Sequence, residues 1–250
     1  MTGAEHCAVD LGEGVGAAFL TRHRGVSAAP YGSLNLGLHV GDSRDHVVAN
    51  RILAARALGL AADRVAWAGQ VHGAGVAVVT ESHAGRGATS ADDALPGVDA
   101  MVTTSTVPLA MLVADCVPVL LARGDASGVA AVHAGRRGLL AGVLSAAADA
   151  LRSDRSRLLA VVGPHIGACC YEVGDDVHAD AVSAEPALDA RTTAGRPALD
   201  LAAGVRAALH RAGVTVTAEV GECTACGPDR WFSYRRDGVT GRTAGVVWRQ

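Results

Sequence analysis

The sequence contains no lysine, so arginine supplies every cationic side chain other than histidine among the 250 residues. Schiff-base catalysis, a lysine general base and the phosphate-binding lysine of Walker-type loops are therefore excluded. Aromatic residues make up only 3% of the chain, so its core must be built from alanine, valine and leucine. No run of about 18 apolar residues occurs, which argues against a transmembrane helix.

Neither positive nor negative charge predominates, because the formal net charge is only -3 and the charges are mixed along the chain. No polybasic arm or basic amphipathic helix is present, so neither nucleic acid nor a membrane surface is an expected partner. The first 14 residues do not have the pattern of a signal peptide. We therefore expect a soluble, cytoplasmic protein, and because no linker or repeat is visible we expect one domain over residues 1–250.

The six cysteines do not predict a disulfide framework in a cytosolic chain of this size. Cys223 and Cys226 have the spacing of a redox or zinc pair, but the chain has no second C-x-x-C. Cys169 and Cys170 are adjacent, and we do not expect both thiols to reach one tetrahedral ion. A structural four-cysteine zinc site is therefore not predicted.

Short apolar runs alternate with amphipathic segments along the chain. Strands are predicted at residues 15–20, 64–70 with a continuation at 76–80, 99–103, 158–162, 214–220 and 244–248. Helices are predicted at residues 43–58, 137–151, 175–182 and 199–211. On the first helix, Val48, Ile52, Ala55 and Leu58 form the predicted apolar face. Residues 23–41 read as a long functional loop, and residues 232–242 as a turn between two strands. Because hairpins and helices are interspersed, the pattern favours an α/β fold with mixed sheets and flanking helices.

Residues 108–138 hold the most reactive pattern in the sequence. One apolar run ends at Asp115 and Cys116, and the next ends at His133 before a Gly-Arg-Arg-Gly turn. His72 follows a third strand-like run, so two imidazoles and one thiolate could meet. Such a donor set suits zinc, with a fourth position left for water or substrate, and copper is also compatible.

Other interpretations of the same residues remain open. Cys116 could be a nucleophile with His133 as its base and Asp115 as an orienting group. Each of the three could instead be an isolated buried side chain. Arg22 ends a strand, and Arg136 and Arg137 open a helix beside His133, which favours an anion such as phosphate or a carboxylate. Surface arginines exposed to solvent are the alternative.

Several motifs in this order resemble those of the laccase-domain family. The matching segments cover residues 19–248 and comprise Thr21-Arg22 with residues 25–27, residues 33–37, residues 39–42, Gln70-Val71-His72-Gly73, residues 114–120, His133-Ala134-Gly135, residues 163–174 and residues 232–236. Members of this family have been called polyphenol oxidases, purine nucleoside phosphorylases and peptidoglycan-editing factors.

The resemblance implies a single layered α-β-β-α sandwich with helices outside mixed strands. It also implies zinc or copper on His72, Cys116 and His133, which would act as the catalytic centre. The implied activity is phosphorolysis of adenosine, inosine and methylthioadenosine, together with adenosine deamination. Arg22 matches a phosphate-binding position, and with Asn35 and Arg137 we assign it to substrate binding.

Two residues depart from the family pattern. Arg136 stands where the family usually has tryptophan, and Arg24 replaces the first glycine of a Gly-Gly pair. We expect metal binding to survive both changes, whereas substrate stacking or loop closure could differ.

The resemblance leaves several functions to weigh. Ten histidines occur without a single His-x-His pair, which argues against a four-copper oxidase, although a single copper would fit the donors. A hydrolase that edits peptidoglycan precursors, using metal-bound water or Cys116, is the strongest alternative to the phosphorylase. A non-enzymatic metal-binding protein is a third possibility. The expected partner is a small-molecule substrate, and the expected state is a monomer or homodimer.

Overall fold

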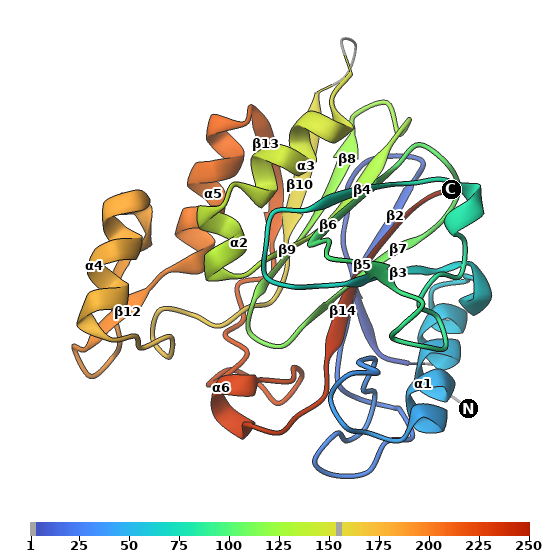
Figure 1. Ribbon diagram of the computed structural model, residues 1–250, viewed down its shortest axis with the longest axis horizontal. Coiled ribbons are helices and arrows are strands. Elements are labelled where there is room, and N and C mark those ends of the chain that lie inside the picture. Colours follow the sequence, from blue (N-terminus) through green and yellow to red (C-terminus); the bar gives the residue numbers. More distant parts are fainter. Residues whose placement is uncertain (1–3, 154–156) are drawn as a thin grey trace.

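The computed structural model describes residues 4–153 and 157–250 and has a mixed α/β fold (Figure 1). Residues 1–3 of the N-terminal stretch considered above lie outside the described part. One six-stranded sheet has the order β1 (His6–Ala8), β2 (Val15–Leu20), β14 (Thr243–Arg249), β7 (Leu109–Val113), β3 (Ala66–Gly69) and β5 (Leu95–Pro96). The other has the order β13 (Val214–Glu219), β10 (Leu158–Val162), β8 (Val117–Arg123), β9 (Val129–Ala134), β6 (Ala100–Thr103) and β4 (Val76–Val79). Both contain parallel and antiparallel pairs, which confirms the predicted mixed sheets.

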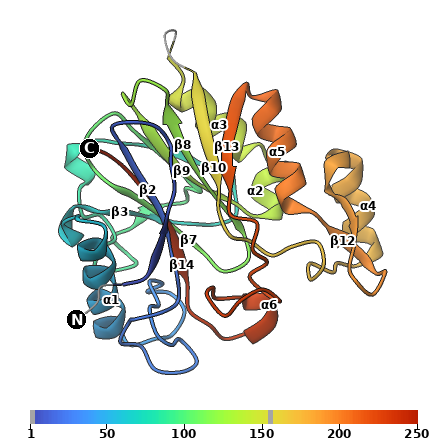
Figure 2. The same cartoon turned by 180° about the vertical axis from the view of Figure 1, so that it is seen from behind.

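Helices cover the outer face of each sheet. α1 (Arg44–Ala57) packs on the first sheet, and α2 (Arg136–Leu140), α3 (Val143–Leu151) and α5 (Leu201–Arg211) pack on the second (Figure 2). α4 (Asp175–Ala184) and the small β11 (Asp189–Arg191)–β12 (Pro197–Leu199) sheet lie at one end of the molecule. The remaining elements are η1 (Ala62–Arg64), η2 (Glu81–His83), η3 (Pro186–Leu188) and α6 (Tyr234–Asp237). The predicted α-β-β-α sandwich is confirmed.

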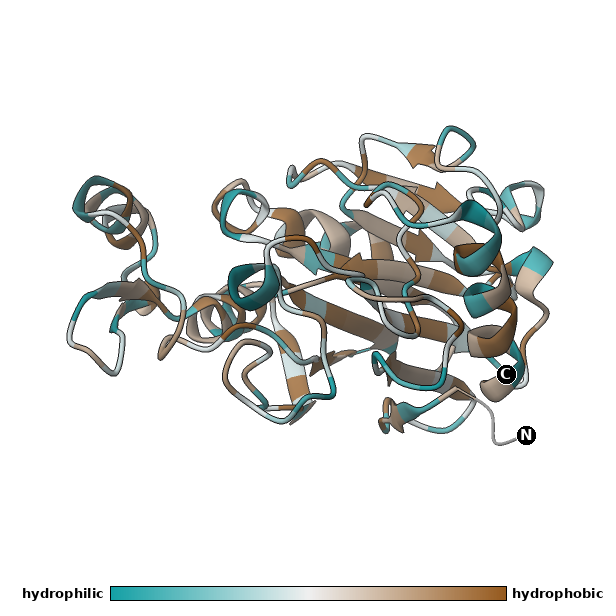
Figure 3. Ribbon diagram, turned by 90° about the horizontal axis from the view of Figure 1, so that it is seen from below, coloured by the Kyte–Doolittle hydropathy of each residue, from teal (hydrophilic) through white to brown (hydrophobic). Residues whose placement is uncertain are grey.

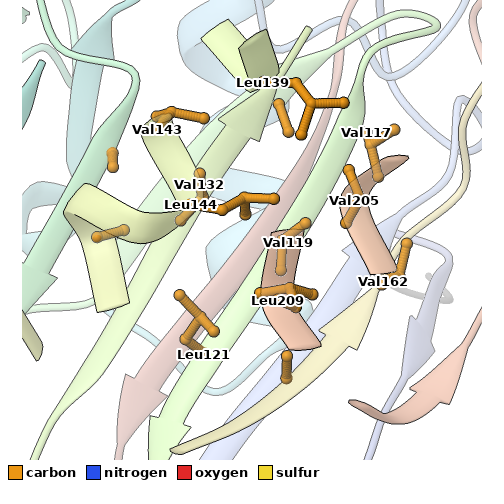
Figure 4. Close-up of a cluster of buried hydrophobic side chains, with 14 of the residues drawn as sticks. Val117, Val119, Leu121, Val132, Leu139, Val143, Leu144, Val162, Val205 and Leu209 are labelled. Atoms are coloured by element: carbon orange, nitrogen blue, oxygen red, sulfur yellow. The ribbon is translucent and has the colours of Figure 1, made fainter. Parts of the chain in front are cut away.

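Strand β8 shows why the central runs are continuously apolar. Val117, Val119 and Leu121 point toward the helices (Figure 4). Leu120 and Ala122 pack in the core between the two sheets. Side chains alternate between the two faces of a strand, and here both faces are covered. Hydropathy colouring shows the same arrangement, with brown strands inside and teal concentrated on surface helices and loops (Figure 3). In the described part of the chain, no helix is long and apolar enough to cross a membrane.

The single helix predicted for residues 137–151 is wrong, because the chain forms two helices there. Gly142 adopts a φ of +86° between α2 and α3, a conformation that ends a right-handed helix. The apolar spacing continues across the break because both helices pack on the same face of the sheet. Periodicity alone therefore could not locate this boundary.

Two further predictions are corrected by the topology. Residues 76–80 do not continue the preceding strand, because β3 and β4 belong to different sheets. The chain crosses between the sheets at residues 70–75, which include His72. Residues 232–242 are not a turn between two strands, since α6 forms there with the Ser233 hydroxyl accepting a hydrogen bond from the Arg236 N–H.

The buried face of α1 also differs from the predicted one. Ile52 is 51% exposed, whereas Asn50 and Arg51 are buried. The Asn50 amide donates to the carbonyls of Ser33 and Asn35, and the Arg51 guanidinium donates to the carbonyl of Leu36. These polar side chains turn inward because they satisfy backbone carbonyls of the loop at residues 23–41. The loop is thereby fixed against α1.

Arg24 lies in this loop with a φ of +67°, at the position where the family pattern has glycine. A side chain in the left-handed region costs about 1–2 kcal/mol, and glycine relieves that cost at some expense in unfolded-state entropy. We expect Arg24→Gly to raise the free energy of unfolding by up to about 1 kcal/mol in urea denaturation. Arg24→Ala is the matched control, since it removes the same side chain but keeps the strain. A glycine variant less stable than the alanine variant would contradict this account.

Candidate metal centre

His72, Cys116 and His133 meet at one point although they are far apart in the sequence. One ligand atom from each lies within 4.8 Å of the others, and the two imidazole centroids are 4.7 Å apart. β8 and β9 form an antiparallel hairpin in which Pro118 pairs with His133. This register brings Cys116, immediately before β8, alongside His133. His72 enters from the crossing between the sheets.

Asp99 organises two of the three candidate ligands. Its carboxylate accepts hydrogen bonds from the backbone N–H groups of Val71 (3.2 Å), His72 (2.9 Å) and Gly73 (2.7 Å). These bonds hold His72 at a φ of +61°, a conformation uncommon for residues other than glycine. The same carboxylate lies 2.8 Å from His133 Nδ1. That contact leaves Nε2 of His133 for a metal, in the carboxylate–histidine arrangement common behind metal ligands.

Asp115 shapes the turn that presents Cys116. It has a φ of +89°, and its carboxylate accepts hydrogen bonds from the Thr224 hydroxyl (2.6 Å) and the Arg235 N–H (2.7 Å). Its carbonyl accepts a hydrogen bond from the Ile166 N–H at 2.9 Å. Three separate segments therefore hold the turn. Asp115 acts on Cys116 through the backbone and not as a partner of His133.

The electrostatics of the pair favour a thiolate beside an imidazolium. Burial opposes ionisation of Cys116, but the adjacent His133 and His72 lower the pKa of the thiol to about 6. Burial likewise opposes protonation of His133, but Cys116 and Asp99 raise its pKa to about 9. The metal-free site therefore holds a reactive thiolate near neutral pH.

A cavity of about 690 Å³ opens above the three side chains. Five arginines from the described part of the chain line it, namely Arg51, Arg136, Arg137, Arg235 and Arg242. Asp115 is the one lining carboxylate among the described residues. The excess of cationic groups suits an anionic or phosphate-containing ligand.

The two arginines that open α2 both reach this cavity. The Arg137 guanidinium donates to the Val71 carbonyl at 3.1 Å, beside His72. Arg136 approaches the Tyr171 hydroxyl, whose pKa is raised by burial and by Cys116 while Arg136 opposes the increase. Arg136, which replaces the usual tryptophan, therefore places charge where the family pattern has an aromatic ring.

Arg22 and Asn35 lie outside the cavity lining. Arg22 pairs with Asp229 at 2.7 Å, donates to the Gly32 carbonyl and lies over the ring of Phe232. Asn35 is fully buried, donates to Asp42 and accepts from the Arg242 N–H. Asn35 thus supports the backbone beside Arg242, which does line the cavity. A role for either residue in substrate binding stays a prediction.

Sequence reasoning missed Asp99 and the arginines contributed by distant segments. A lone acidic residue directly before the apolar strand at residues 100–103 was the available signal for Asp99. Arg235 lies in a recognised motif and Arg242 follows it, but no local pattern indicates that either faces Cys116. Only the packing of the C-terminal segment against the β7–β8 turn brings them there.

A cluster of four cysteines forms a second candidate metal site. It contradicts the expectation that the adjacent Cys169 and Cys170 thiols could not both reach one ion. Ligand atoms of Cys169, Cys170, Cys223 and Cys226 lie within 4.8 Å of one another. The turn that contains Cys169 and Cys170 directs both side chains toward the 223–226 segment. Burial opposes ionisation of Cys223, but the backbone N–H groups of Cys226, Gly167 and Ala225 lower its pKa to about 7.

The residues of the first site fit a zinc ion chemically. Two imidazoles and a thiolate are borderline and soft donors that zinc accepts, and three protein ligands leave one position open. Copper accepts the same donor types, so the side chains alone do not choose between the metals. The site is arranged as a catalytic centre is, with an open cavity on one side and Asp99 fixing the ligands on the other.

Metal binding at this site should depend on pH. Below pH 9 the His133 ring carries a proton that must leave before Nε2 can bind a metal, whereas Cys116 is already ionised above pH 6. Zinc affinity should therefore rise about tenfold per pH unit from pH 6 to 9 and level off above that. Calorimetry in buffers of different ionisation enthalpy, after subtraction of the signal of His72→Ala, which lacks this site, should count one proton released per zinc bound here at pH 7.5. No difference in proton release between the native protein and His72→Ala would contradict the assignment.

Comparisons with known proteins agree with this fold. The sequence model described as "Multi-copper polyphenol oxidoreductase laccase" matches residues 16–250. A Streptomyces coelicolor protein named purine nucleoside phosphorylase is 49% identical over 243 residues, covering 96% of this chain and 97% of that protein. A Corynebacterium glutamicum protein with the same name is 42% identical, with 92% of each chain covered.

Solved structures show the same architecture. YlmD from Geobacillus stearothermophilus superposes with a TM-score of 0.86 at 36% identity, covering 95% of this chain and 93% of that one. The Bacillus licheniformis protein YfiH gives a TM-score of 0.87 at 33% identity, covering 94% and 93%. The fold and the His–Cys–His group define an α/β protein with a candidate metal centre in an arginine-rich cavity. The chain belongs to the laccase-domain family, as its motifs predicted.

Proposed function

We propose that the protein is a zinc-dependent purine nucleoside phosphorylase that acts on adenosine, inosine and methylthioadenosine and also deaminates adenosine. The observation that carries the proposal is the His72–Cys116–His133 group in a cavity lined by arginines. The names of the relatives from Streptomyces coelicolor and Corynebacterium glutamicum support the substrate class. A cavity of about 690 Å³ has the volume of a typical small-molecule site.

Phosphate would bind to the arginines of the cavity. Arg137 is held beside His72, and Arg235 is held at the Asp115 turn next to Cys116. Guanidinium groups bind phosphate oxygens in pairs, so such arginines would orient a phosphate oxygen toward C1′ of the ribose. A bond would form between that phosphate oxygen and C1′ as the C1′–N9 bond breaks. The purine would leave with the bonding electron pair and take up the proton of hydrogen phosphate, which gives free purine and pentose 1-phosphate.

The purine would occupy the more apolar part of the cavity. Trp67, Leu38 and Leu112 line it there, and Arg51 stacks on the Trp67 ring at 3.7 Å. His39 also lines the cavity, and burial together with the charges of Arg242 and Arg51 lowers its pKa. A neutral imidazole can both donate and accept a hydrogen bond, which suits recognition of a purine edge.

A zinc ion on His72, Cys116 and His133 would supply Lewis-acid polarisation of a substrate atom at its open position. Asp99 keeps His133 oriented, and the Asp115 turn keeps Cys116 in place. Both carboxylates are already bound to protein groups, so their role is to position ligands. Cytoplasmic location and the monomeric or dimeric state stay predictions.

The test is product analysis on zinc-loaded protein. Adenosine, inosine or methylthioadenosine is incubated with and without phosphate, and the free base, the pentose 1-phosphate and ammonia are measured. The proposal expects base and pentose 1-phosphate in equal amounts, formed only with phosphate, and ammonia from adenosine. Base release that does not depend on phosphate would indicate hydrolysis and overturn the phosphorylase assignment.

The Cys116–His133–Asp99 alignment favours one second candidate, a thiol hydrolase of peptidoglycan precursors. The thiolate of Cys116 would be the nucleophile, His133 the acid and base, and Asp99 the orienting group. Zinc distinguishes the two functions, because a zinc ion bound to the Cys116 sulfur would prevent that sulfur from acting as a nucleophile. Hydrolysis of muropeptide precursors by metal-free protein, inhibited by zinc, would select the hydrolase.

A further inference from the structure

The four cysteines at residues 169–170 and 223–226 lie outside the cavity and have no part in the proposed reaction. Among the described residues they form one of two groups with the side chains to hold a metal ion. We propose that Cys169, Cys170, Cys223 and Cys226 bind a zinc ion of their own, as a structural site behind the cavity wall. This inference does not rest on the proposed function.

Sulfur spacing supports a metal more than a disulfide. The Cys169 and Cys226 sulfurs are 3.5 Å apart, and all four sulfurs lie within 4.8 Å of one another. With Zn–S bonds of 2.3 Å, a tetrahedral zinc keeps its sulfurs about 3.8 Å apart. A disulfide requires about 2.05 Å, and all four cysteines are free thiols. One small ion could therefore reach every sulfur with little movement.

The backbone around Cys223 is built to support a metal thiolate. The Gly167 N–H donates to the Cys223 sulfur at 3.2 Å, and the N–H groups of Ala225 and Cys226 face the same sulfur. Amide N–H groups that point at a sulfur stabilise its ionised, metal-binding form. The segment 223–226 thus forms a tight loop around its own first cysteine.

Gly227 closes that loop in a way other residues could not. Its N–H donates to the Cys223 carbonyl at 2.9 Å, and a Cβ at this position would lie 2.3 Å from that oxygen. The sequence Cys-x-x-Cys-Gly therefore serves the loop geometry. The adjacent pair Cys169–Cys170 would supply the other two thiols, so the proposed site needs no second C-x-x-C.

Neighbouring charge suits a zinc–thiolate centre. Arg235 and Arg236 line the same hollow as Cys169 and Cys170, and the Arg236 guanidinium donates to the Thr224 carbonyl at 2.9 Å. A zinc ion with four thiolates carries an excess of negative charge, which these guanidinium groups would offset. Glu172 lines the same hollow and Asp237 pairs with Arg236 at 2.7 Å, so these arginines would offset part of that charge.

The site would join two walls of the catalytic cavity. Ile166 and Tyr171, which flank the first cysteine pair, line the cavity, and Thr224 lies inside the second pair and holds Asp115. An ion bridging the two segments would fix the turn that presents Cys116. Its loss should loosen that turn without removing any ligand of the first site.

Zinc content of the purified full-length chain, prepared under reductant, tests the proposal. We expect two zinc ions per chain in the native protein, one in Cys226→Ser and one in Cys116→Ala. Cys7→Ser is the matched control and should keep both, since Cys7 lies in β1, away from both clusters. In cobalt-loaded protein, the intense thiolate-to-cobalt absorption should persist in Cys116→Ala and be largely lost in Cys226→Ser.

A measurement on the native chain covers the case in which the serine variant fails to fold. A mercurial reagent added stepwise should release two zinc ions, one of them coupled to modification of Cys169, Cys170, Cys223 and Cys226 in peptide mapping. One zinc per chain with these four thiols free would overturn the proposal. A Cys169–Cys226 disulfide in native protein prepared under reductant would overturn it as well.

Discussion

Replacing Cys116 with alanine should remove the zinc ion of the His–Cys–His site and abolish phosphorolysis. The thiolate is the only anionic donor of that site, and its loss leaves two imidazoles that bind zinc weakly. A metal typically contributes several kcal/mol of transition-state stabilisation, which corresponds to a loss on the order of 10³-fold or more in kcat/KM. Zinc analysis and a phosphorolysis assay on the same preparation measure both effects.

Cys7→Ser is the control for this variant. Cys7 is half-buried in β1 and packs against the core between the sheets, so a fold-level effect of losing a thiol would appear there too. We expect the control to keep its zinc and its turnover. Full phosphorolysis by a Cys116→Ala protein that lacks zinc at this site would show that the site is not the catalytic centre.

Asp99→Asn should weaken the metal site and destabilise the fold together. The carboxylate is fully buried and accepts three backbone N–H groups while contacting His133 Nδ1. An asparagine has the same shape, but its NH₂ end would face an N–H donor and leave buried groups unsatisfied. We expect a loss of about 3 kcal/mol in the free energy of unfolding.

The same substitution acts on the metal through His133 and the His72 turn. Removing such a supporting carboxylate typically lowers metal affinity by about 10–100-fold. Chelator competition measures the affinity, and urea denaturation of the metal-free protein measures the stability separately. Asp92→Asn, at an exposed position, is the matched control. Wild-type zinc affinity in Asp99→Asn would mean that the Asp99 contacts do not orient the ligands.

The candidate ligands could be predicted from sequence because each lies at or next to the end of an apolar run. All three follow an apolar run, but only His72 and His133 have a glycine within two residues, so the resemblance to the laccase-domain family was needed to select Cys116 with them. The mixed sheets followed from the alternation of strands, hairpins and helices. What the pattern could not supply was the β8–β9 register that places Cys116 beside His133. Pairing partners depend on tertiary packing, which a single sequence does not encode locally.

Other features escaped prediction for reasons that can be named. The Asp99 carboxylate accepts hydrogen bonds from three backbone N–H groups of a turn that is distant in sequence. No fixed spacing in the sequence marks such a contact. The break at Gly142 was hidden because both helices share one buried face. The sequence does not predict the four-cysteine cluster because side chains of adjacent residues usually diverge, whereas the turn at Cys169 and Cys170 directs both thiols toward Cys223. In each case the backbone geometry of the folded chain determined the arrangement, and the local sequence pattern did not indicate it.

The most direct test is turnover as a function of zinc bound at the His72–Cys116–His133 site. Protein stripped of metal is titrated with zinc, and phosphate-dependent release of purine from adenosine and inosine is followed alongside occupancy. We predict no release from the stripped protein and a rate that rises in proportion to occupancy of this site. Full release by stripped protein, or none by protein with the site filled, would contradict the account.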